Sequence, residues 1–296
     1  AETGTLDPKP LYYMGQYVFV TWLSRLTNLP LELVDRFLVP LLAGLLPLLL
    51  LLTPKTEQRG WRDAAFLLFI PLASFVATTP QSFAYILGLA AILSALDASE
   101  HKPHPTIALA FAAWSLTVHP LAGLPFACAA IALLLSRRAI SWLFVAAAGL
   151  AIPISFLIIS RGASTTIAWD FSRLMDIGTW MQSLSALGPP RNRVALWPDW
   201  TAIVLFLSFP VALLSACLAA WKDIGRRKTW MLLIGSAIAC VIAGLVMRAA
   251  GDFAFLIDYE RGNYADRLFL IALFLLVPAA AAGAGSLLAK LEAAPA

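Results

Sequence analysis

The stretch Ala64–Leu96, AAFLLFIPLASFVATTPQSFAYILGLAAILSAL, holds 33 residues without one charged side chain. A second charge-free run, Pro105–Ser136, holds 32 residues. About 20 apolar residues cross the roughly 30 Å hydrocarbon core of a bilayer, so each run is too long for one span and long enough for a tight helical hairpin. Turn signals near the middle of each run, TTPQ at 78–81 and His119-Pro120, predict the two breaks. The alternative is one long kinked helix per run.

The composition is typical of a membrane protein. Hydrophobic residues make up 60% of the chain and charged residues 13%, with a mean hydropathy of +0.82, whereas soluble domains are about 25% charged. The apolar runs do not alternate in polarity as transmembrane strands do. We therefore predict an all-α polytopic bundle that forms a single transmembrane domain over residues 1–296. The nine predicted spans are Leu33–Thr53, Trp61–Thr79, Ser82–Leu96, Pro105–His119, Leu121–Ser136, Ile140–Ser160, Trp200–Trp221, Thr229–Met247 and Leu268–Leu288.

The loops between these spans alternate in charge. One set, five short loops, holds eleven Lys and Arg residues against six acids, whereas the other holds ten against eleven. Short basic loops stay in the cytoplasm, so segments 1–32, 161–199 and 248–267 should face outward. We expect a multi-pass integral protein of a bacterial inner (plasma) membrane with its active face outside. With nine spans and an amino terminus on the outside, the sequence shows no signal peptide or start-transfer helix that would direct the chain into the membrane. We therefore expect either a preceding span or a signal that was cleaved before Ala1.

Composition also limits the partners and cofactors. The net charge of +4 comes without a basic patch interleaved with exposed aromatics, so we expect the lipid bilayer and no nucleic acid as partner. Cys128, Cys217 and Cys240 fall inside predicted spans without paired spacing, which favours apolar packing over a disulfide or zinc site. No spacing of His and acidic residues indicates a metal site. A divalent ion is compatible with the sequence, and the sequence does not identify a cofactor.

The first outer segment predicts an interfacial helix. Apolar and aromatic residues recur every three or four positions over residues 11–27, which is the pattern of an amphipathic helix at a membrane surface. A plain connector resting on the membrane is the alternative. The order of Asp7, Pro-x-Pro-Leu-Tyr-Tyr at 8–13, this helix, Asp35-Arg36 and a Leu-rich span resembles the start of GT-C class membrane glycosyltransferases. That class includes protein mannosyltransferases, oligosaccharyltransferases and lipid A aminoarabinose transferases.

Two later features extend the resemblance to residues 7–135 and 256–285. The hairpin turns with Gln81 and Tyr85 and with His119 are similar to those of the class. Tyr264-Ala-Asp266-Arg267, at the start of the last span, resembles the Arg-Tyr-Leu-x-Pro pattern that follows the last outer loop in many members. The expected first span and most of the first outer loop are absent from the sequence.

The resemblance implies sugar transfer from a polyprenyl-phosphate donor, with an acidic residue of the first outer loop as catalytic base. Asp7 or Glu2 is the candidate base, or the true acid lies upstream of Ala1. Arginines beside tryptophans at headgroup level suit a lipid-linked phosphate, because guanidinium binds phosphate bidentately; interfacial anchoring is the alternative. The candidate substrate-binding residues are Lys9, Tyr12, Tyr13, Gln81, Tyr85, His119, Arg191, Arg193, Asp258, Glu260, Arg261, Tyr264 and Arg267.

Each candidate group also has a simpler explanation. His119 is compatible with phosphate or metal binding, but a histidine at this position more often caps the turn. Arg248 and Asp252 are four apart and would pair on a helix. For the whole chain, the leading hypothesis is a polyprenyl-phosphate-dependent glycosyltransferase. The alternatives are a transporter or lipid flippase, which usually places ionisable groups near the midplane, and a non-catalytic subunit of GT-C type.

Overall fold

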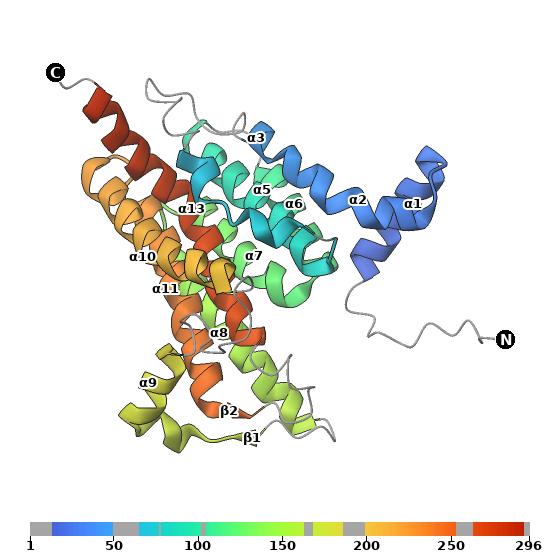
Figure 1. Cartoon of the computed structure of the whole chain (residues 1–296). Coiled ribbons are helices and arrows are strands. Elements are labelled where there is room, and N and C mark those ends of the chain that lie inside the picture. The colour runs from blue at the N-terminus through green and yellow to red at the C-terminus, as the bar shows by residue number, and fades with distance from the viewer. Residues whose placement is uncertain are drawn as a thin grey trace.

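A computed structural model of the chain shows an all-α architecture (Figure 1). It describes residues 14–49, 65–76, 78–101, 105–162, 168–185, 199–252 and 263–292. The α-helices are α1 (Met14–Thr27), α2 (Leu31–Gly44), α3 (Leu46–Leu49), α5 (Pro80–His101), α6 (Pro105–Val118), α7 (Pro120–Leu134), α8 (Ser141–Gly162), α9 (Ile177–Ser185), α10 (Asp199–Lys222), α11 (Arg227–Ala250) and α13 (Asn263–Glu292). The structure also has two 3₁₀ helices, η3 (Leu72–Phe75) and η4 (Phe171–Met175), and two short strands, β1 (Ala168–Trp169) and β2 (Gly251–Asp252).

Three helices, α8, α11 and α13, are long and apolar enough to cross a membrane. Helices α5, α6, α7 and α10 contain shorter apolar stretches. Helix α13 is largely buried by its neighbours, whereas α8 exposes aliphatic side chains such as Leu143 and Ile158. Such an apolar outer surface is expected of helices that face lipid and is rare on soluble proteins. The described helices thus agree with a membrane protein, but they do not establish nine spans.

The breaks in the charge-free runs are confirmed. Helix α5 begins at Pro80, and His119 alone separates α6 from α7, so neither run is one long kinked helix. The prediction of Trp61–Thr79 as a single span is wrong. There a short helical turn ends before a bend at Ile70 and Pro71, and η3 follows. Pro71 has no backbone N–H to donate to the preceding turn, which explains the interruption.

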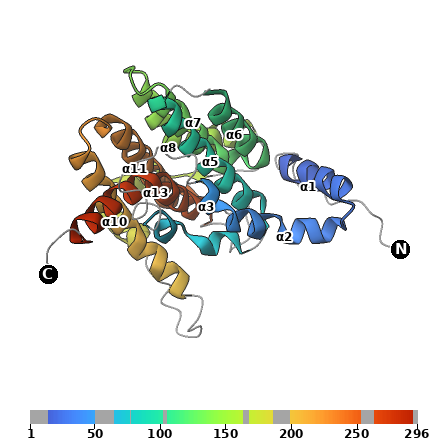
Figure 2. The same cartoon turned by 90° about the horizontal axis from the view of Figure 1, so that it is seen from above.

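The apolar helices pack closely through small residues. Viewed from above, α10, α11 and α13 lie together, α5 to α8 lie beside them, and α1 and α2 project from the opposite edge (Figure 2). A Cβ at Gly283 of α13 would lie 1.8 Å from the carbonyl oxygen of Ser215 in α10, so a larger residue would push these helices apart. The Ser115 hydroxyl donates to the Ala84 carbonyl at 2.9 Å and ties α6 to α5. Small residues and interhelical hydrogen bonds are the usual means of helix packing in membranes.

The bundle has two chemically different ends. At one, β1 pairs antiparallel with β2, so that Ala168 faces Asp252 and Trp169 faces Gly251. This end, called the loop end below, therefore holds the described parts of both segments 161–199 and 248–267, as predicted. The other end, called the basic end below, is formed by the α7–α8 turn (135–140) and the α10–α11 turn (223–226). Helix α11 begins at the basic end and ends at the loop end. Its 24 residues at 1.5 Å each separate the two ends by about 36 Å.

Candidate functional site

Four of the predicted substrate-binding residues come together at the loop end. Gln81 and Tyr85 lie in the first turns of α5, His119 lies between α6 and α7, and Arg267 lies in the first turn of α13. The positive charge of Arg267 acts on both the Tyr85 hydroxyl and the His119 ring. We call these four residues the Arg267 cluster. Segments almost 190 positions apart in the sequence thus contribute to one polar group of side chains.

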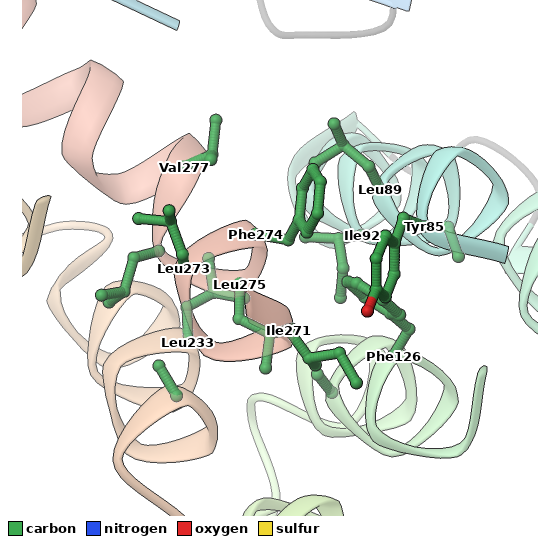
Figure 3. Close-up of a cluster of buried hydrophobic side chains, with 14 of the residues drawn as sticks. Tyr85, Leu89, Ile92, Phe126, Leu233, Ile271, Leu273, Phe274, Leu275 and Val277 are labelled. Atoms are coloured by element: carbon green, nitrogen blue, oxygen red, sulfur yellow. The ribbon is translucent and has the colours of Figure 1, made fainter. Parts of the chain in front are cut away.

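Tyr85 is held by the aromatic core of the bundle. Its ring packs against Phe274 of α13 at a centroid distance of 5.0 Å and against Phe126 of α7 at 6.2 Å. Figure 3 shows Tyr85 among Phe126, Ile271 and Phe274, at the place where α5, α7 and α13 meet. The amide nitrogen of Gln81, one turn earlier, donates to the Tyr85 hydroxyl oxygen. Since the hydroxyl accepts this bond, its own hydrogen can be donated to another group.

His119 caps α7, as its simpler explanation predicts. Its Nδ1 accepts a hydrogen bond from the Ala122 N–H at 3.1 Å, so the proton of the neutral ring is on Nε2. In this turn between helices, burial lowers the pKa of His119 to about 3, and the positive charge of Arg267 acts in the same direction. His119 is therefore neutral at physiological pH and has an Nε2–H donor. Capping uses Nδ1, so any hydrogen bond that the ring donates comes from Nε2.

An ion pair between helices fixes the start of α13. Arg248 of α11 pairs with Asp266 of α13, directly before Arg267. The prediction that Arg248 pairs with Asp252 is wrong, because α11 ends at Ala250 and Asp252 lies in β2. Sequence reasoning missed the true pair, since its members are 18 positions apart across a loop and no helical spacing connects them. The signal that was present is the density of charges just before the last apolar run.

The described charges of residues 170–176 serve local structure. Asp170 caps η4 and pairs with Arg173 at 3.2 Å. Asp176 accepts hydrogen bonds from the N–H groups of Gly178 and Thr179 and so caps α9. Hydrogen bonds from Ser172 hold the pKa of Asp170 below its ordinary value, and hydrogen bonds from Thr179 and Gly178 do the same for the pKa of Asp176. These carboxylates remain ionised at neutral pH and are fully used by the loop.

The amino-terminal helix begins next to the turn that holds His119. A Cβ at Gly15 would lie 2.6 Å from the carbonyl oxygen of Thr117, so only glycine permits this contact between α1 and the end of α6. The exposed face of α1 carries apolar residues such as Val18 and Trp22, whereas Gln16 is buried and donates to Asp35 of α2. The predicted helix over 11–27 is thus confirmed from Met14 onward. Its apolar outer face suits a lipid surface.

The remaining candidates lie outside the described residues. They are Glu2, Asp7, Lys9, Tyr12, Tyr13, Arg191, Arg193, Asp258, Glu260 and Arg261. Tyr264 belongs to the first turn of α13, and only its backbone is described. Among the described residues, no group of three or more His, Cys, Asp or Glu side chains lies close enough to hold a metal ion.

The Arg267 cluster is suited to an anion. Gln81 and Arg267 are partly exposed, whereas Tyr85 and His119 are buried. Arg267 contributes a permanent charge, and the side chains around it supply N–H and O–H donors. A phosphate at this place would reach the two partly exposed side chains, Arg267 and Gln81. No protein-family model, no curated protein and no solved structure matches this chain.

Proposed function

We propose that this protein is a membrane glycosyltransferase that moves a sugar from a polyprenyl-phosphate donor to an acceptor hydroxyl on the extracytoplasmic face. The observation that carries the proposal is the Arg267 cluster, a set of donors around one arginine at the end of apolar helices. A lipid-linked phosphate needs this combination, because its charged group lies at the interface while its isoprenoid tail stays in hydrocarbon. Nine crossings, the outward orientation and a bacterial inner membrane belong to the same proposal.

The proposed reaction joins the acceptor oxygen to the anomeric carbon of the sugar. The bond from that carbon to the phosphate oxygen breaks, and its electron pair leaves with the phosphate. Asp7, or Glu2, takes the proton of the acceptor hydroxyl. The guanidinium of Arg267, with Arg191, Arg193 and Arg261 as further candidates, stabilises the negative charge on the departing phosphate.

The course of the chain supports a role for Asp7. Gly15 contacts Thr117, two positions before His119, so the segment that carries Asp7 joins the described structure beside the Arg267 cluster. Asp7 precedes Met14 by seven positions, and seven extended residues span at most about 25 Å. A carboxylate on this segment is therefore within reach of a sugar whose phosphate is held by Arg267.

The alternative transport functions have less support. The predicted spans within α8, α11 and α13 carry no Asp, Glu, His, Lys or Arg between their ends. Ion-coupled transporters usually place such groups, or broken helices, near the midplane. The break at Ile70 and Pro71 is of the second kind, but residues 65–76 around it hold no charged side chain. A non-catalytic subunit would keep the phosphate site and lack the base, and the fate of a labelled sugar distinguishes the two.

The test compares Arg267→Gln with Arg267→Lys in membranes supplied with a labelled polyprenyl-phosphate sugar. We expect Arg267→Gln to lower sugar transfer about 100-fold or more, the scale of losing a charge-stabilising donor. Arg267→Lys should recover part of the rate, because it keeps the charge without the bidentate geometry. Arg25→Gln, an exposed arginine of α1, is the matched control. Equal transfer by all variants would refute the proposal, and proton- or sodium-driven uptake by proteoliposomes would favour a transporter.

A further inference from the structure

We propose that the basic end of the bundle is a binding site for the phosphate headgroup of an anionic phospholipid. The site is formed by the α7–α8 turn and by the α10–α11 turn with the first residues of α11. It is distinct from the Arg267 cluster and does not depend on the proposed function. Its two halves come from parts of the chain about 90 positions apart.

A direct contact holds the two turns together. The Lys228 ammonium donates a hydrogen bond to the carbonyl oxygen of Arg138 at 3.5 Å. Behind this contact α8 packs against α11, where Val145 and Trp142 lie next to Gly235. The cations of both turns are thus presented by one rigid piece of the bundle.

The cations at this end are in excess over the acids. Arg137, Arg138, Arg227 and Lys228 are exposed, and none of them forms a salt bridge with a carboxylate of the described residues. The acid of the α10–α11 turn, Asp223, is engaged by Arg226 at 3.9 Å. Four exposed cations on two joined turns attract a phosphate diester, which guanidinium groups bind with two hydrogen bonds.

Apolar side chains beside these cations favour a lipid over free phosphate. Trp142 at the start of α8 is 45% exposed, Trp221 at the end of α10 is 76% exposed, and Ile224 between the helices is 79% exposed. Tryptophan is enriched at the level of lipid headgroups because its ring is apolar and its N–H is polar. The exposed aliphatic residues of α8 and α10 continue this surface toward the middle of the membrane and offer a place for acyl chains.

The test uses the purified full chain in detergent, with phosphatidylglycerol, phosphatidylcholine or inorganic phosphate added. Native mass spectrometry counts the bound lipids, and thermal melting measures ligand stabilisation. We expect the wild type to retain phosphatidylglycerol in preference to phosphatidylcholine, and inorganic phosphate to leave the melting temperature unchanged. R137Q/R227Q removes one guanidinium from each turn and leaves the Lys228–Arg138 contact intact. Since each cation contributes about fivefold near an anionic headgroup, this variant should bind phosphatidylglycerol about 25-fold more weakly.

The control R25Q/R36Q removes the same net charge from exposed positions of α1 and α2, and it should stay within twofold of the wild type. Equal retention of both lipids by the wild type, or equal losses in both double variants, would overturn the proposal. If R137Q/R227Q melts below the wild type without lipid, the single variants R137Q and R227Q replace it, each with an expected fivefold effect.

Discussion

The two ends of the bundle carry arginines in opposite settings. At the loop end the side chain of Arg248 is 16% exposed and pairs with Asp266, and the positive charge of Arg267 acts on the Tyr85 hydroxyl and the His119 ring. At the basic end, four cations are exposed and have no salt bridge with the described acids: Arg137, Arg138, Arg227 and Lys228. A buried cation must be compensated within the protein, whereas an exposed one can be compensated from outside. The charge of Arg248 is therefore matched within the protein, whereas the cations of the basic end are free to meet an anion from outside.

The largest effect on stability should come from breaking the ion pair at the loop end. Asp266→Asn leaves the mostly buried Arg248 guanidinium without its carboxylate, so we expect a loss of about 2 kcal/mol, below the range for fully buried pairs because Asp266 is half-exposed. Thermal melting in detergent measures this loss. The exchange R248D/D266R should recover part of the stability. Melting of Asp266→Asn at the wild-type temperature would show that the loop end is no more tightly organised than the basic end.

The second prediction separates the two nitrogens of His119. His119→Asn keeps a side-chain acceptor for the Ala122 N–H and loses the Nε2 donor, whereas His119→Gln does the reverse. Loss of the cap should cost His119→Gln about 1 kcal/mol, while His119→Asn should be stable and impaired in sugar transfer. Parallel losses of stability and transfer in both variants would leave only a structural role for this histidine.

The same pair of variants tests the pH dependence. The pKa of His119 is about 3 in the folded protein and close to the ordinary value of 6.5 in the unfolded chain. Below pH 6.5 the unfolded chain therefore binds a proton that the folded protein rejects, so stability falls as the pH drops from about 6.5 toward 3. Because His119→Asn has no titrating ring and should match the wild type near neutral pH, its melting temperature should exceed that of the wild type by a growing margin over this range. A constant difference would contradict the burial of a neutral ring.

The sequence was informative where one short stretch decides the structure. Pro80 and His119-Pro120 mark helix breaks through the local chemistry of proline, and the structure has both breaks. The helix at Met14–Thr27 follows in the same way from its apolar spacing. Trp61–Thr79 failed because its composition suits a span, while Pro71 interrupts the helix. Apolar composition shows that a segment is favourable in lipid, but it does not ensure the continuous backbone hydrogen bonding of one α-helix.

The site was less accessible to sequence reasoning, because its geometry depends on packing between distant helices. Gln81 and Arg267 are candidates for separate reasons, one in a hairpin turn and the other before the last apolar run. Nothing in the sequence places them in one cluster. The pairing of β1 with β2 and the ion pair between Arg248 and Asp266 also depend on packing, because the end of α11 must lie beside the start of α13. Contacts of this kind join segments that local periodicity treats independently.

The smallest effect should come from the basic end in the absence of lipid. Arg227→Gln removes an exposed guanidinium that has no salt bridge with the described residues, so the free energy of unfolding in neutral detergent should change by less than about 0.5 kcal/mol. Asp266→Asn, at the loop end, is expected to lose several times more. Thermal melting of both variants, with and without phosphatidylglycerol, compares the two ends in one experiment. Lipid should stabilise Asp266→Asn as much as the wild type and Arg227→Gln less, because only the latter lacks a headgroup contact. Equal stabilisation of both would place the lipid elsewhere on the bundle.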